Sequence, residues 1–161
     1  MGANQLLDIE RRVELAGLEL LKAWTLLTTL TTAPRVRRAW DKSVKADYPA
    51  GTIEAVMMSE YGRMTGWYNG AMRLSALTFQ ADDKSRIVCD KIMGALRGWA
   101  QQEDLKAQMN ASASAIAAGT ELSVEYIVCD GIPFWADETD RVNELVLDVR
   151  ILARPSRGTG K

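Results

Sequence analysis

The sequence predicts an α+β fold in which two helices pack on one face of a four-stranded, mainly antiparallel sheet. Two long segments place hydrophobic residues three or four positions apart, as on one face of a helix. The last third of the chain holds two segments in which apolar and polar residues alternate, as in strands covered on one side. A further strand pair lies between the helical segments. The expected element order is therefore helix, strand, strand, helix, strand, strand.

Residues 4–30 predict the first helix, because Ile9, Val13 and Leu20 share the three-four spacing. The helix is expected to end in the threonines that precede Pro34, since β-branched residues and proline both disfavour its continuation. The first helical segment is thus predicted to be long and amphipathic.

Residues 35–51 are basic and follow no periodic pattern, so they predict a connector. Residues 52–61 and 71–80 are rich in strand-forming residues and flank a loop with three glycines and an Asn-Gly step. This arrangement predicts an antiparallel strand pair with a long tip that carries Trp67 and Tyr68.

The second helix is predicted to begin at an N-cap aspartate, Asp82 or Asp83, and to run to residue 100. Its apolar stripe includes Val88 and Trp99. Residues 101–120 are polar and then rich in alanine and serine, which leaves a frayed helix, a strand and a loop all open.

Residues 121–130 and 141–154 predict the last two strands, joined by a long loop. In the first strand Leu122, Val124, Tyr126 and Val128 are expected on the covered face; in the second, Leu145, Leu147, Val149 and Ile151. Residues 1–154 are expected to form one domain, followed by a disordered tail over 155–161.

Composition excludes several function classes. The net charge of −1 gives no reason for general affinity to nucleic acid or membranes, although patches of both signs occur. Neither a signal peptide nor an apolar membrane-spanning segment is expected. The chain contains no histidine, which removes histidine acid–base catalysis, hydrolase triads and most zinc chemistry.

The candidate chemical groups favour structural roles. Asp137, Glu138 and Asp140 could bind a divalent cation or act as acid and base, but their spacing is not that of a calcium loop, so a solvated loop is favoured. Cys89 and Cys129 fall in apolar periodic segments and are expected to pack in the core. No phosphate-binding or dinucleotide-binding motif is present, and no cofactor is expected.

The basic cluster of the connector includes Arg35, Arg37 and Arg38, with aromatic residues interleaved. A solvated face or a protein contact is favoured over single-strand nucleic-acid binding. The tip aromatics Trp67 and Tyr68 are expected to pack on their own hairpin more readily than to serve as a platform.

Two stretches carry a resemblance to a known family. One is AMRLSALTFQADDKSRIVCDKIMGALRGW, a strand that runs through an acidic turn into an amphipathic helix. The other is GIPFWADETDRVNELVLDVRILA, an apolar and acidic loop that leads into the final strand. Together with the element order, they resemble the tail terminator (tail completion) proteins of long-tailed bacteriophages.

The resemblance implies a structural virion protein of the tail or neck, assembled in the host cytoplasm, and no enzyme. Such proteins form a ring, typically hexameric, that caps the tail tube, ends its polymerisation and joins the head connector. Double-stranded DNA passes through the ring without sequence-specific binding. A closed head-to-tail ring needs two different patches on each subunit. The candidate interface residues are Phe134, Trp135, Asp137, Glu138, Asp140, Trp67, Tyr68, Arg35, Arg37 and Arg38.

Three alternatives stay open. The chain could be another phage neck, connector or sheath-cap ring protein. It could also be a small metal-dependent enzyme that uses the carboxylates of residues 137–144, or a nucleic-acid binder through the arginines of residues 35–38. For the 131–142 loop, contact between Trp135 and a neighbouring subunit is favoured over packing on the sheet.

Overall fold

The computed structural model describes residues 2–31, 35–39, 48–60, 67–79, 83–112, 116–117, 120–136 and 142–156. The helices are α1 (Gly2–Lys22), α2 (Thr25–Thr28), α3 (Asp83–Ala100) and α4 (Leu105–Ala111). The strands are β1 (Val36–Arg38), β2 (Ala50–Glu60), β3 (Tyr68–Phe79), β4 (Ile116–Ala117), β5 (Thr120–Val128), β6 (Phe134–Trp135) and β7 (Val142–Ser156).

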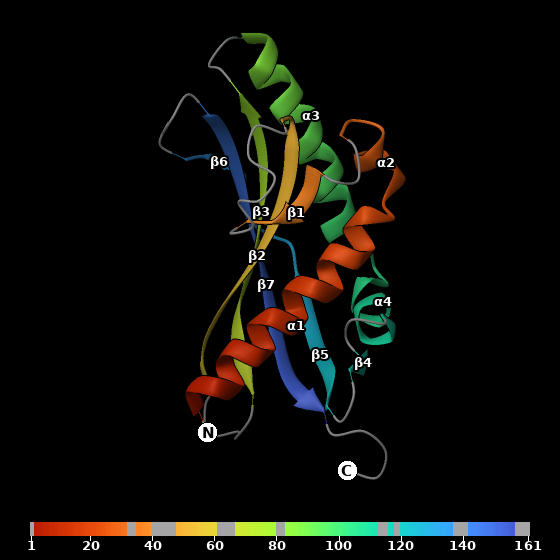
Figure 1. Cartoon of the computed structure of the whole chain (residues 1–161), viewed down its shortest axis with the longest axis vertical. Helices are drawn as coiled ribbons and strands as arrows, with labels where there is room; N and C mark the ends of the chain where they lie inside the picture. The colour runs from red at the N-terminus through yellow and green to blue at the C-terminus, as the bar shows by residue number, and fades with distance from the viewer. Residues whose placement is uncertain are drawn as a thin grey trace.

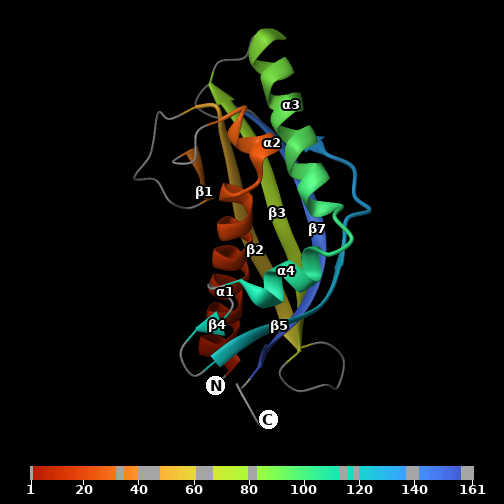
Figure 2. The same ribbon diagram turned by 90° about the vertical axis from the view of Figure 1, so that its right-hand side faces the viewer.

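The described strands form one mixed sheet in the order β1-β2-β3-β7-β5-β4. Strand β1 runs parallel to β2, and the other pairs are antiparallel. The long β7 pairs with β6 near its start and with β5 over its second half. The helices lie on one face of the sheet (Figures 1 and 2). The α+β class and the two antiparallel pairs are confirmed, whereas the four-stranded sheet is corrected to a larger, mixed one.

The core lies between the helices and the inner face of the sheet. Its α1 side is built from the predicted stripe, with Ile9 and Val13 fully buried. Gly17 lets α1 approach β2 closely, because a Cβ atom there would collide with the Ile53 side chain. The predicted inner face of β7 is confirmed, since Leu147 and its alternating neighbours are buried. Burial of these side chains is the main stabilising term of the fold.

The first helix ends earlier than the sequence predicts. Helix α1 stops at Lys22, and Trp24 has an extended backbone (φ −80°, ψ 102°) before the single turn of α2. The Trp24 indole N–H donates to the carbonyl oxygen of Ala95 in α3 at 2.9 Å. This tertiary contact accompanies a break in the helix that periodicity alone did not indicate.

The sequence did not place the short strands β1, β4 and β6, and it left the conformation of residues 101–120 open. Strand β1, within the predicted connector, pairs in parallel with β2, and Val36 lies opposite Gly51. Within the open 101–120 segment, α4 forms because Leu105 and Met109, four positions apart, are both buried. Strand β6 forms inside the last loop. Strand β7 extends to Ser156, two residues past the predicted domain end, and residues 157–161 lie outside the described part.

A β-bulge changes the phase of β5. The register with β7 shifts between Val124 and Tyr126, so the alternation predicted for this strand holds only up to Val124. Beyond the bulge Ile127 packs against the core, and Tyr126 is only partly buried. A shift of one residue exchanges the two faces of a strand, which corrects the predicted positions of Tyr126 and Val128.

Side chains from the helices bond to part of the backbone at two edges of the sheet. Past the end of β1, the backbone N–H groups of Ala55 and Met57 donate to Glu14 and Glu10 of α1, each at 2.9 Å. On the other side, Asn110 of α4 accepts from the N–H of Val124 at 2.7 Å and donates to its carbonyl oxygen at 3.1 Å. Edge strands with unsatisfied backbone groups invite pairing with other chains, so these contacts disfavour strand addition at Ala55, Met57 and Val124.

Candidate interaction surface

The sheet face opposite the helices is the first candidate surface. No described helix lies over it (Figures 1 and 2). By register and burial, it carries the outward side chains of β2, β3 and β7. Val56 is 47% exposed there, and Phe79 at the far end of β3 is 48% exposed. An antiparallel sheet commonly leaves one face to solvent or to a partner.

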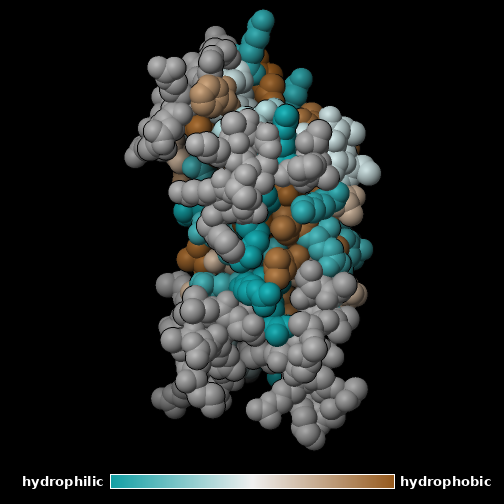
Figure 3. All heavy atoms as spheres, viewed as in Figure 1, coloured by the Kyte–Doolittle hydropathy of each residue, from teal (hydrophilic) through white to brown (hydrophobic). Residues whose placement is uncertain are grey.

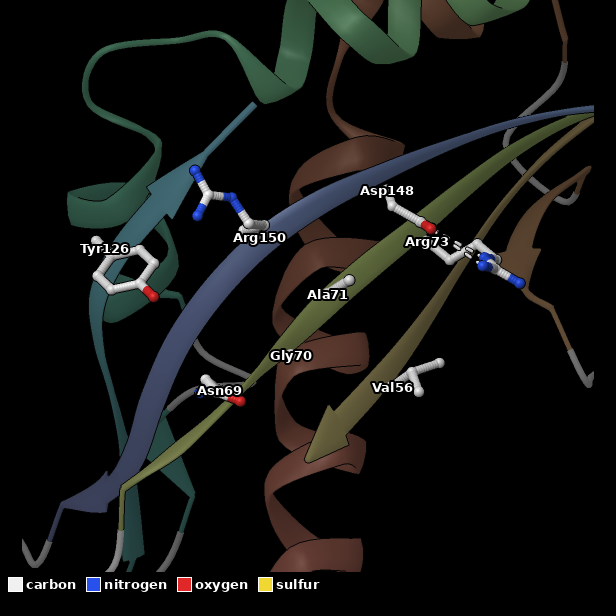
Figure 4. Close-up of a pocket in the computed structure, with 8 residues that line it drawn as sticks. All are labelled: Val56, Asn69, Gly70, Ala71, Arg73, Tyr126, Asp148 and Arg150. Atoms are coloured by element: carbon white, nitrogen blue, oxygen red, sulfur yellow. Dashed lines mark hydrogen bonds and ion pairs between the residues drawn. The ribbon is translucent and has the colours of Figure 1, made fainter. Parts of the chain in front are cut away.

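This face is hollowed. A concavity of about 540 Å³ lies across β2, β3, β7 and β5 (Figure 4). Its lining consists of Val56, Asn69, Gly70, Ala71, Arg73, Tyr126, Asp148 and Arg150. Gly70 and Ala71 keep the floor low, because neither has a large side chain. A Cβ atom on Gly70 would collide with the carbonyl oxygen of Val56, so the close approach of β2 and β3 requires glycine there.

A charged row crosses the sheet beside the hollow. Glu54, Arg73 and Asp148 occupy paired positions on β2, β3 and β7. The Arg73 guanidinium donates two hydrogen bonds to Asp148, at 2.9 and 3.0 Å. The pKa of Arg73 is raised, and the largest cause is this hydrogen bond to Asp148. Partial burial lowers the pKa, whereas the negative charges of Asp148, Glu54 and Glu144 raise it further. Arg73 thus lies between two carboxylates in register, with the third, Glu144, further along β7.

The basic end of the chain is used within the fold. Arg150 donates to Asp130 at 2.8 Å, and both side chains are largely exposed. The Arg154 guanidinium lies 4.8 Å from the centre of the Trp67 ring. Trp67 is therefore not a bare platform at the hairpin tip.

Strand β6 places the two aromatic residues singled out in the sequence on opposite faces. Phe134 pairs with Val146 and lies beneath Arg73, whose guanidinium is 6.0 Å from the ring centre. Trp135 lies beside α3, with Arg86 at 4.6 Å from its ring centre. Phe134 is 46% exposed and Trp135 38% exposed. Neither side chain belongs to the core.

Ile132, at the start of this loop, is 81% exposed, the most exposed of the large hydrophobic residues described. The acidic residues of the loop, Asp137, Glu138 and Asp140, lie outside the described residues. The described part of the loop thus presents three large hydrophobic side chains within four residues.

Other predicted interface residues are held inside the fold. Tyr68 is 2% exposed and belongs to the core, which removes it from the hairpin tip. Arg37 is 8% exposed and lies over the Tyr48 ring at 5.8 Å. Arg38 donates to Glu14 at 2.7 Å, and Arg35 is partly buried. The basic cluster of the connector is therefore not a uniformly solvated face.

The cysteines behave as packing residues. The Cys89 thiol is fully buried and donates to the carbonyl oxygen of Ala76 at 3.0 Å; burial raises its pKa. Burial also raises the pKa of Cys129, which packs against the core from the end of β5. No group of carboxylate and cysteine side chains among the described residues is arranged to hold a metal ion. No helix in the same residues is long and apolar enough to cross a membrane.

Sequence reasoning brought Phe134 and Trp135 to attention but missed the hollow and the row of charges. The small residues Gly70 and Ala71 on β3 were the available signal for the hollow. The row depends on strand order, because β3 and β7 are far apart in the sequence. Comparison with protein-family models found no match, and comparison with curated proteins found none either.

Proposed function

We propose that this chain is a structural ring subunit that resembles phage tail terminators. In this role it caps the tail tube, ends tube polymerisation and provides the surface to which the head connector attaches. It acts by binding other protein subunits and catalyses no reaction. Copies of the chain form the ring, and the genome passes through it without sequence-specific contacts.

The exposed hydrophobic side chains of the β6 loop carry this proposal. Ile132, Phe134 and Trp135 are 81%, 46% and 38% exposed. Burial of Ile132 against a partner contributes up to about 1.5–3 kcal/mol, and the half-buried Phe134 and Trp135 each contribute roughly half of that or less. Tryptophan and arginine are enriched among the residues that dominate binding at protein interfaces, and Trp135 lies beside Arg86.

The closed edges support assembly with a defined number of subunits. Strand addition at an open edge can continue without limit, whereas Glu10, Glu14 and Asn110 occupy the edge hydrogen-bonding groups of β2 and β5. This favours contacts through faces and loops. A ring subunit needs two such patches that differ, because a head-to-tail interface joins unlike surfaces.

Deletion of the gene from a phage that carries it tests the proposal. Tails of unregulated length without attached heads are expected, and the wild-type gene should restore uniform tails. Restoration should fail with a Trp135→Ala variant that is folded but cannot assemble. Tails of normal length and normal attachment would refute the proposal. Tails of normal length that lack heads would assign the chain to a different neck ring.

A further inference from the structure

The outward face of α3 is strongly basic. Over residues 84–100 its exposed charged side chains are Lys84, Arg86, Lys91, Arg97 and one acid, Asp90. Neither Lys84 nor Lys91 makes an ion pair within the described residues. Between these two lysines Ile87 is 53% exposed, and a side chain added at Gly94 would meet nothing within 4 Å. The helix thus offers an accessible ridge with two cations around one hydrophobic side chain.

The opposite layer of the molecule presents the complementary charge. On the uncovered sheet face, Glu54 and Asp148 flank Arg73 in register, and Glu144 lies further along β7. Arg150 at the hollow is paired with Asp130, so four carboxylates face two arginines there. The hollow beside this cluster is lined partly by Val56 and Ala71, which suit a hydrophobic side chain (Figure 4).

The spacings also agree. Lys84 and Lys91 are seven positions apart on a helix, which separates them by roughly 10 Å along its axis. Glu54 and Asp148 lie on strands separated by β3, which also places them roughly 10 Å apart. A helix laid across the sheet brings each lysine near a carboxylate.

We propose that the α3 ridge of one copy docks on the acidic, hollowed sheet face of the next copy. Lys84 and Lys91 face Glu54 and Asp148, with Glu144 further along β7, and Ile87 enters the hollow. This contact is one of the two-patch, head-to-tail interfaces that the proposed function requires, and the inference rests on that function.

A second copy fits this ridge better than duplex DNA does. The acidic partner surface exists on the same chain, and Ile87 would gain nothing from a phosphate backbone. Hydrophobic areas on the molecular face seen in Figure 3 are small and separate among the coloured atoms. Charge complementarity between the α3 ridge and the acidic sheet face favours a second copy as the partner.

The test uses two charge-reversed variants of the full chain. One is Lys84→Glu with Lys91→Glu, and the other is Glu54→Lys with Glu144→Lys. Asp148 is left unchanged because its loss would release Arg73. Lys22→Glu with Lys106→Glu is the matched control, since both lysines are exposed on other helices. Circular dichroism confirms folding, and the neutral Glu54→Gln, Glu144→Gln variant replaces the second if it fails to fold.

Native mass spectrometry and light scattering then measure self-association. Each reversed variant alone should associate at least about tenfold more weakly than the wild type, because like charges now meet. An equal mixture of the two reversed variants should assemble again, with both chains in each particle, and the control should match the wild type. If the Glu54→Gln, Glu144→Gln variant is used instead, it should associate more weakly than the wild type. The mixing experiment is then omitted, because this variant carries no lysines to pair with the reversed ridge.

Self-association that the reversals leave unchanged would overturn this interface while leaving the proposed ring function in place. A wild-type chain that stays monomeric at high concentration would overturn both. Loss of duplex-DNA retention in the Lys84→Glu, Lys91→Glu variant, with association unchanged, would instead assign the ridge to nucleic acid.

Discussion

Glu14 of α1 accepts the backbone N–H of Ala55 in β2, with 2.9 Å between Oε2 and the amide nitrogen. Its other oxygen, Oε1, accepts from the guanidinium of Arg38 at 2.6–2.7 Å. The Glu14 side chain is 5% exposed and that of Arg38 17% exposed. One carboxylate therefore joins the first helix, the short edge strand β1 and the unpaired edge of β2.

Glu14→Ala is expected to lower the free energy of unfolding by about 3 kcal/mol or more, because it leaves a largely buried guanidinium and a backbone N–H without this partner. Glu14→Gln should cost less, since the amide oxygen can still accept one of these bonds. Urea denaturation of the two variants measures the difference.

Glu103→Ala provides the control, because Glu103 is exposed in the turn after α3. Its change should stay within about 0.5 kcal/mol. Equal effects of Glu14→Ala and Glu103→Ala would show that the Glu14 contacts contribute nothing to stability.

Asn110→Ala removes both hydrogen bonds to the backbone of Val124 at the bulged edge of β5. A loss of about 1–3 kcal/mol is expected, because two backbone groups lose their partners. Hydrogen exchange of the Val124 amide should accelerate more than that of amides in the centre of β3. An unchanged exchange rate at Val124 would contradict the edge-closing role of Asn110.

Gly70→Ala and Gly94→Ala should change stability in opposite directions. The new methyl group at position 70 would meet backbone atoms of Val56 and Met57, which cannot move aside without disturbing β2. At position 94 it meets nothing within 4 Å, and alanine favours a helix over glycine by about 1 kcal/mol. Thermal unfolding at low protein concentration compares them, and a stable Gly70→Ala variant would refute the close strand approach.

The buried thiols make stability fall at alkaline pH. Burial raises the pKa of Cys89 and Cys129 above the ordinary value of 9.0, so the folded state keeps protons that the unfolded state releases. Their contribution is fully present below about pH 9 and is lost as pH rises further. The urea midpoint of Cys89→Ala should decline less between about pH 8 and 10 than that of the wild type. Parallel declines would contradict this assignment.

Trp135→Ala separates stability from assembly. The ring is 38% exposed and stacks on Arg86, so the isolated subunit should lose only about 1 kcal/mol or less. Self-association, however, should weaken at least about tenfold if the ring is buried against a neighbour. Light scattering and thermal unfolding on the same sample distinguish the outcomes. A large loss of thermal stability with normal association would return Trp135 to a structural role.

The sequence predicts the long elements because each repeats one pattern over many residues. The predicted inner residues Ile9, Val13 and Trp99 are buried, as are the four of β7, whereas Leu20 and Val88 are only partly buried. Val146, expected on the opposite side of β7, is also buried. Periodicity could not reveal β1 or β6, which have three and two residues and exist only through pairing with β2 and β7. The bulge at Val124–Tyr126 is invisible to a strict period of two.

The candidate surface was predictable only in part. Phe134 and Trp135 stand out because large aromatics beside acids are unusual. Tyr68 was predicted at the hairpin tip because its neighbours in the sequence are typical of a loop, but it is buried in β3. The charged row could be predicted only if the strand order were known, because Arg73 and Asp148 are 75 positions apart in the sequence. The sequence did not indicate that Arg38 of the basic connector is ion-paired, because its partner Glu14 is distant in the sequence.

Native mass spectrometry of the wild-type chain tests the central claim most directly, because a ring subunit must assemble into particles of one size. A single closed oligomer is expected, with six copies if the resemblance to tail terminators holds. Its population should rise with protein concentration and stop at that size. A chain that stays monomeric, or that grows into particles without limit, would contradict the account.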